Sequence, residues 1–148
     1  MNEKTSRQST EPVPTAAEMM FSFIAAGHAI EKRIEDALDQ VGLSACKFGV
    51  LTHLVLAAEP LSLSECAARM TCVRSNITQL MDRLEAEGLV RRVEDPSDRR
   101  AVRAAVMPLG RERQAAGALK MEAVEADFAQ SLAGIDRRAL QETLSAIK

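Results

Sequence analysis

Tryptophan and tyrosine are absent from the 148 residues of this chain, and aromatic side chains account for only 3% of them. Alanine, leucine, glutamate and arginine are abundant instead, and these residues have high helix propensity. The length fits one domain with a real hydrophobic core. We therefore expect a mostly helical globular protein.

Long apolar runs are also lacking. The most apolar stretch, residues 49–58, is much shorter than the roughly 18 residues of a membrane span, and it contains His53. Residues 1–14 are polar with no hydrophobic segment behind their charges, so we expect a flexible tail and neither a signal peptide nor a membrane anchor. The three cysteines are an odd number without framework spacing, which predicts reduced thiols and a cytoplasmic location.

Motifs for catalysis and metal binding are missing as well. The sequence has no C-x-x-C pair, no cysteine–histidine set with zinc spacing and only two histidines. No glycine-rich phosphate loop, nucleophile motif or pair of catalytic carboxylates stands out. We expect no enzyme activity, no metal site and no cofactor.

Positive charge is concentrated in one segment, although the net charge of the chain is −2. Residues 69–103 carry a formal charge of +2, and the remainder carries −4. This excess is small, so it permits DNA binding without establishing it.

The order of the expected elements defines the fold class. Capping signals and helical spacing predict six helices. The first three are expected at residues 15–42, from 44 to the proline at 60, and at 62–70; the fourth ends at the glycine at 88; the last two run from 109 to about 134 and from 136 onward. Alternating residues predict two strands at 89–94 and 102–107. We expect a mainly α fold with a small β-hairpin wing, a winged helix-turn-helix flanked by long helices.

The helix that ends at Gly88 has one face rich in hydroxyl and amide groups. On a helical wheel its apolar residues lie together. The opposite face and its flanks carry Arg74, Ser75, Asn76, Thr78, Gln79 and Asp82. Such side chains pair with base edges and phosphates, so this helix is a candidate reader of DNA. A polar outer face without a reading role is the alternative.

Two neighbouring features extend this hypothesis. Ser62 and Ser64 open the preceding short helix, where backbone N–H groups attract phosphate, although capping alone would also account for them. Arg99 and Arg100 lie at the tip of the predicted hairpin and suit the narrow, negative minor groove, with Asp98 able to hold one guanidinium. A solvated turn with local ion pairs is the alternative at the tip.

The segment SNITQLMDRLEAEGLVRRVEDPSDRRAVRAAVMPLG resembles the winged-helix signature of MarR-type transcription regulators, through D-R-L-E-x-x-G-L-V at 82–90 and D-P-x-D-R-R at 95–100. The resemblance implies one domain at residues 15–148. Its helices at residues 15–42 and 109–148 would hold a homodimer together, and residues 44–107 would form the winged helix-turn-helix. It also implies a reader helix in the major groove, a wing arginine in the minor groove steadied by Asp98, and half-sites about one helical turn apart.

The cysteines mark departures from this family, which often has serine or threonine in place of Cys72 and proline in place of Cys46. Cys66 lies on an apolar stripe and is expected in the core. Cys72 lies at the start of the reader helix beside Arg74, a setting that favours the reactive thiolate, so we interpret it as a candidate redox switch. An inert small residue is the alternative.

Small-molecule control is the other possible signal, because regulators of this family commonly hold phenolic or carboxylic ligands between the DNA-binding lobe and the dimerising helices. His28, Arg33 and His53 could line such a space, although each taken singly is also explained as an ordinary surface or partly buried residue.

The sequence thus favours a dimeric repressor that binds double-stranded DNA at a near-palindromic operator and is released by a small molecule or by thiol oxidation. The alternative is a winged-helix module that docks another protein, which would bind without steep salt dependence.

Overall fold

The computed structural model describes residues 12–70 and 76–147, and the chain divides into two compact units, Met1–Lys32 and Arg33–Lys148. The first unit contains the beginning of α1 (Ala16–Asp39). A capping box begins this helix, as the sequence predicts: Thr15 Oγ1 accepts a hydrogen bond from Glu18 N at 3.3 Å, and Glu18 Oε2 accepts one from Thr15 N at 2.7 Å.

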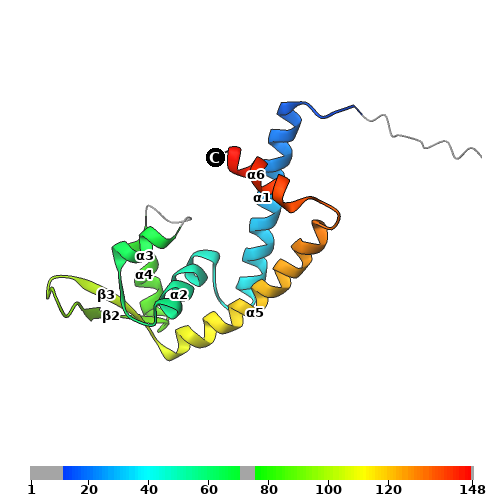
Figure 1. The fold of residues 1–148 in the computed structure, drawn as a ribbon. Helices are drawn as coiled ribbons and strands as arrows, with labels where there is room; N and C mark the ends of the chain where they lie inside the picture. Colours follow the sequence, from blue (N-terminus) through cyan, green and yellow to red (C-terminus); the bar gives the residue numbers. More distant parts are fainter. Residues whose placement is uncertain (1–11, 71–75, 148) are drawn as a thin grey trace, which may run out of the picture. The chain divides into compact units, whose positions relative to one another are not determined.

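Among its described residues, the second unit holds a small sheet and five more helices (Figure 1). In chain order its elements after α1 are α2 (Ala45–Ala57), β1 (Leu61–Ser62), α3 (Leu63–Arg69), α4 (Ile77–Ala86), β2 (Val90–Glu94), β3 (Val102–Val106), α5 (Pro108–Ser131) and α6 (Arg137–Ala146). The mainly α fold with a hairpin wing is confirmed.

The sheet is antiparallel with strand order β1-β3-β2. Strand β3 pairs with β2 over its full length, from Val102 opposite Glu94 to Val106 opposite Val90, and with β1 only through Leu61 and Ser62. The sequence does not predict strand β1, because a strand of two residues is too short to show an alternating pattern.

Capping residues set most helix ends where the sequence predicts them. Ser44 accepts from Lys47 N at the start of α2, and Asp136 accepts from Arg138 N and Ala139 N at the start of α6. The first helix is shorter than the predicted 15–42: it ends at Asp39, because Gly42 has φ +70 and Leu43 N turns back to bond Leu38 O.

The core of the second unit joins α2, α4 and the sheet. Its largest fully buried side chains include Leu51 and Leu54 from α2, Met81 and Leu84 from α4, and Leu89 just before β2. The chain turns from α4 into β2 at Gly88, whose φ of +72 is the left-handed conformation expected of a residue that follows a helix. This packing fixes the hairpin against the helix that precedes it.

The start of α5 lies directly on the root of the hairpin. Met107 N bonds Leu89 O at 2.9 Å, and a Cβ on Gly110 would meet the same oxygen at 2.1 Å. Only glycine fits so close to a carbonyl group.

Replacing Gly110 by alanine should therefore lower the free energy of unfolding by about 2 kcal/mol or more, because the backbone of Leu89 cannot move aside cheaply. Gly49→Ala is the matched control: it lies inside α2, its Cβ would meet only Met70 Cε at 3.5 Å, and alanine is the better helix former. Urea unfolding of both variants measures the two free energies of unfolding. Equal stability of Gly110→Ala and Gly49→Ala would contradict the prediction.

Candidate nucleic-acid interface

Helix α4 separates its two faces as the helical wheel predicts. Leu80, Met81 and Leu84 are buried, whereas Thr78, Gln79 and Asp82 are exposed. Asn76, the residue before the helix, is also exposed, and its Nδ2 donates to Gln79 Oε1 at 2.5 Å. The predicted reader positions Arg74 and Ser75 lie outside the described residues. The described part of the polar face is therefore accessible and carries amide groups at its start.

An arginine from the hairpin forms ion pairs with two carboxylates of α4. Arg92 Nη2 lies 2.5 Å from Asp82 Oδ1, and Arg92 Nη1 pairs with Glu85 Oε2. The backbone N–H of Arg92 donates to Glu85 Oε1 at 3.0 Å, and this bond and the guanidinium hold the pKa of Glu85 below its usual value. Arg92 of β2 thus offsets one of the two negative charges of this carboxylate pair.

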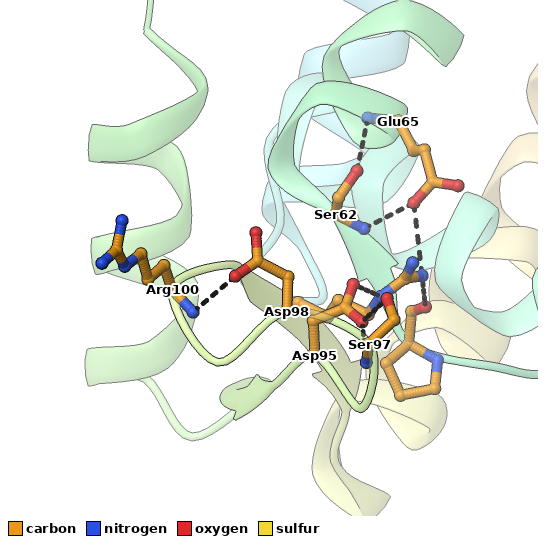
Figure 2. Close-up of polar contacts among 8 residues, drawn as sticks. Ser62, Glu65, Asp95, Ser97, Asp98 and Arg100 are labelled. Carbon is orange, nitrogen blue, oxygen red and sulfur yellow. Dashed lines mark hydrogen bonds and ion pairs between the residues drawn. The ribbon is translucent and has the colours of Figure 1, made fainter.

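The wing tip differs from the expectation in one respect. Arg99 and Arg100 are exposed, as predicted, but Asp98 Oδ1 accepts from the backbone N–H of Arg100 at 2.9 Å and pairs with no guanidinium among the described residues. Figure 2 shows the Arg100 side chain extending away from the Asp98 carboxylate. Asp98 follows the usual behaviour of aspartate in turns, bonding the backbone two residues on. It orders the turn and leaves both guanidinium groups accessible.

A buried carboxylate lies at the base of the wing. Asp95 is only 8% exposed; its Oδ1 accepts from Ser97 N at 2.8 Å and Ser97 Oγ at 2.6 Å, and its Oδ2 from Arg103 Nε at 2.5 Å (Figure 2). The bonds from Ser97, followed by the one from Arg103, hold the pKa of Asp95 far below its usual range.

The same arginine reaches the start of α3. Arg103 Nη1 donates to Pro60 O at 3.1 Å and lies 3.5 Å from Glu65 Oε2. Glu65 belongs to the capping box of α3, in which Glu65 N donates to Ser62 Oγ at 3.1 Å and Ser62 N donates to Glu65 Oε2 at 2.7 Å. The bond from Ser62 N holds the pKa of Glu65 below its usual value.

These contacts bear on the two serine candidates. Ser62 caps α3, which is the alternative that the sequence left open, and Ser64 is exposed on the first turn. The sequence does not predict the ion pair of Asp95 and Arg103, because the two residues lie eight positions apart on two sides of a loop. Their positions on opposite sides of the predicted hairpin turn are the one sequence feature that points to this pair.

The candidate ligand residues do not form one described site. Arg33 lines a cleft of about 750 Å³ together with Asp36 and Gln40 of α1 and Asp127 and Gln130 of α5, among others. His53, half-buried on α2, does not line this cleft, and His28 is exposed in the first unit.

The described cysteines lie in different surroundings. Cys66 is fully buried in the core, as predicted, and burial raises the pKa of its thiol. Cys46 lines a cleft of about 220 Å³ between α2 and α4, and Cys72 lies outside the described residues. Within residues 12–70 and 76–147, no group of three metal-ligating side chains occurs and no helix is long and apolar enough to cross a membrane.

The succession of α3, α4 and the β2–β3 hairpin defines a winged helix-turn-helix protein. Residues 49–102 match the model of the MarR family. This match and the similarity to known transcription regulators confirm the resemblance to MarR-type regulators noted in the sequence.

Two relatives come from Bacillus subtilis (strain 168). The HTH-type transcriptional regulator YsmB is 29% identical over 101 residues, which are 68% of this chain and 68% of YsmB. The HTH-type transcriptional regulator YkoM is 33% identical over 82 residues, which are 55% of this chain and 52% of YkoM.

A similar solved structure is that of CouR from Rhodococcus jostii RHA1 bound to p-coumaroyl-CoA, with 27% identity and a TM-score of 0.70 over 88% of this chain and 89% of CouR. A second structure shows the transcriptional repressor CouR on a 23-mer DNA duplex, with 27% identity and a TM-score of 0.71 over 87% and 91% of the two chains. These relatives are transcription regulators.

The charged base of the wing predicts acid sensitivity. Because the pKa of Asp95 is lower in the folded chain than its ordinary value of 3.8, the ionised carboxylate stabilises the fold above that value, and this stabilisation is lost as the pH falls below it. Urea unfolding of the wild type between about pH 7 and pH 3 should show a loss of stability that begins as the pH approaches about 4.

Asp95→Asn should start less stable at neutral pH and lose less on acidification. Glu94→Gln, an exposed neighbour on β2, should keep the wild-type slope. If the stability of Asp95→Asn fell with pH as steeply as that of the wild type, Asp95 would not be the source of the acid sensitivity.

Proposed function

We propose that the chain is a sequence-specific DNA-binding repressor that inserts α4 into a major groove and the wing tip into the adjacent minor groove. The observation that carries this proposal is the exposed amide and hydroxyl face of α4, at Asn76, Thr78 and Gln79, combined with the exposed Arg99 and Arg100 on the wing. Short polar side chains suit base edges, and arginine suits the narrow minor groove.

Each candidate residue has a distinct role in this proposal. Ser75, Asn76, Thr78 and Gln79 contact base edges, and Arg74 contacts a base or a phosphate. Arg100, or alternatively Arg99, enters the minor groove. Ser62 and Ser64 contact phosphate at the start of α3, and Asp98 acts indirectly, because its bond to Arg100 N shapes the turn.

A homodimer is part of the proposal. Several large apolar side chains of α1, α5 and the end of α6 are exposed in the single chain, namely Met20, Phe21, Ile24, Leu119, Phe128, Leu144 and Ile147. Water-exposed apolar surface of this extent favours burial against a partner. We assign residues 15–42 and 109–148 to dimerisation and 44–107 to DNA binding, so that two copies read a near-palindromic operator.

The release signal is either a small molecule or oxidation of a thiol. Ligand-bound CouR supports the first alternative, for which His28, Arg33 and His53 are the candidate contacts. The inducer must bind the DNA-incompetent dimer more tightly than the competent one. For the second, an adduct on Cys72 would face the duplex and weaken binding.

Selection from a pool of random duplexes of about 30 base pairs tests the DNA-binding proposal, because two half-sites one helical turn apart fit within that length. Arg100→Ala should weaken binding to the selected duplex about tenfold, and Gln79→Ala should change which sequences are selected. Fluorescence anisotropy with increasing salt should show a steep loss of affinity for the wild type.

Arg137→Ala on α6 is the charge-matched control, since it removes one exposed arginine outside the residues proposed to contact DNA and is not one of the apolar residues proposed for dimerisation. It should leave affinity within about twofold of wild type. Binding that selects no sequence and depends little on salt would instead support the protein-docking module.

Peroxide and phenolic acids separate the two release signals. If Cys72 is the switch, peroxide should release the wild type from the selected duplex, Cys72→Ser should stay bound, and reduction should restore wild-type binding. Equal release of both proteins by peroxide would exclude Cys72, and release by the phenolic acid alone would assign control to a ligand.

A further inference from the structure

We infer that Arg103 is a positioning residue for DNA recognition: its guanidinium ties the base of the wing to the start of α3 and so fixes where the wing arginines meet the minor groove. This inference rests on the proposed function, because it concerns how the wing is aimed. Arg103 itself lies four residues beyond Arg99, inside β3, and its side chain is only 28% exposed.

The first step concerns the tip loop, residues 95–101. Its two ends are joined by the bond from Asp95 N to Ala101 O at 3.1 Å, and inside the loop Ala101 N bonds Asp98 O at 2.9 Å. The Asp95 carboxylate closes the base by holding Ser97 on one side and Arg103 Nε on the other. Asp95 therefore holds both ends of the loop that carries Arg99 and Arg100, at Ser97 through its carboxylate and at Ala101 through its backbone N–H, and Arg103 binds the same carboxylate.

The second step concerns the attachment of this loop to the helix-turn-helix. The inner edge of β3 pairs with only two residues of β1, so backbone bonding across this edge is short. Arg103 lies at the end of that pairing, opposite Ser62, and adds bonds to Pro60 O and Glu65 Oε2. These bonds connect the wing to the capping box of α3.

The third step concerns the other strand. Arg92 binds β2 to Asp82 and Glu85 of α4, so each strand of the hairpin has one arginine that reaches a helix of the helix-turn-helix. Two attachments on different strands prevent the hairpin from pivoting about either one. Small displacements of a recognition element lower binding affinity. Loosening one attachment should therefore first weaken the contact of the wing arginines with the minor groove.

Arginine is required for this arrangement. In one planar guanidinium, Nε donates to Asp95 on one side, and Nη1 donates to Pro60 O and Glu65 on the other. The single ammonium group of lysine cannot hold both sides in a fixed geometry. A direct phosphate contact by Arg103 is the competing explanation, and it predicts a different mutational pattern.

A double-mutant cycle distinguishes the two explanations, using a labelled duplex of about 30 base pairs that carries the selected sequence. Arg100→Ala should cost about tenfold in affinity in the wild-type background but only about twofold in Arg103→Met, because a misaimed wing gains little from its arginine. Gln79→Ala should cost the same in both backgrounds, since α4 keeps its attachment through Arg92.

Arg91→Met is the matched control, because Arg91 is exposed on the neighbouring strand and its loss removes the same charge. In that background Arg100→Ala should keep its full cost. Arg103→Lys should give a cost for Arg100→Ala between those in the wild-type and Arg103→Met backgrounds. An equal cost of Arg100→Ala in all backgrounds would overturn the inference and support a direct phosphate contact.

Hydrogen exchange in the DNA-free protein gives a second readout. The Ala101 and Arg100 amides should exchange faster in Arg103→Met than in wild type, whereas α4 amides should be unchanged. If Arg103→Met is unfolded at the assay temperature, Asp95→Asn replaces it in the same cycle. A wild-type protein that selects no DNA would refute the proposed function itself, whereas selective binding with unchanged coupling and exchange would refute only the role of Arg103.

Discussion

The close approach of α5 to the root of the hairpin is the constraint on which the rest of the second unit depends. Leu89 O receives the N–H of Met107 and lies where a side chain on Gly110 would have to be. Through this contact the exit of α4, both wing strands and the start of the last long helix meet at one place. A change in the direction of α5 would therefore be transmitted to the wing without passing through any flexible linker.

The electrostatics of the DNA-binding segment follow from pairing and not from net charge. Arg92 pairs with Asp82 and Glu85, Arg103 with Asp95, and Lys47 with Glu87 at 2.5 Å. Arg91 on β2 and the two tip arginines are exposed on the wing. An overall acidic protein can thus present a local positive surface to a polyanion.

The sequence predicts the elements of this fold well, because caps and periodicity are local. Thr15, Ser44, Ser62 and Asp136 begin helices as expected, and Gly88 follows α4. The missed features depend on tertiary contacts: the strand β1 exists only because β3 lies beside it, and the pairs of Arg92 and Arg103 join residues across turns. The sequence indicates that Asp98 can hold a guanidinium, but its carboxylate instead accepts from the backbone N–H of Arg100, two residues on.

The amide pair at the start of α4 has a consequence for discrimination between DNA sequences. In the absence of DNA, Asn76 and Gln79 satisfy each other at 2.5 Å. In the proposed complex, contact with a base edge would require this internal bond to open, so a matching base would replace a bond that the protein already has, whereas a mismatched base would leave both amides without that bond. Under the proposal, selectivity would then come more from a penalty on incorrect sites than from a gain on the correct one.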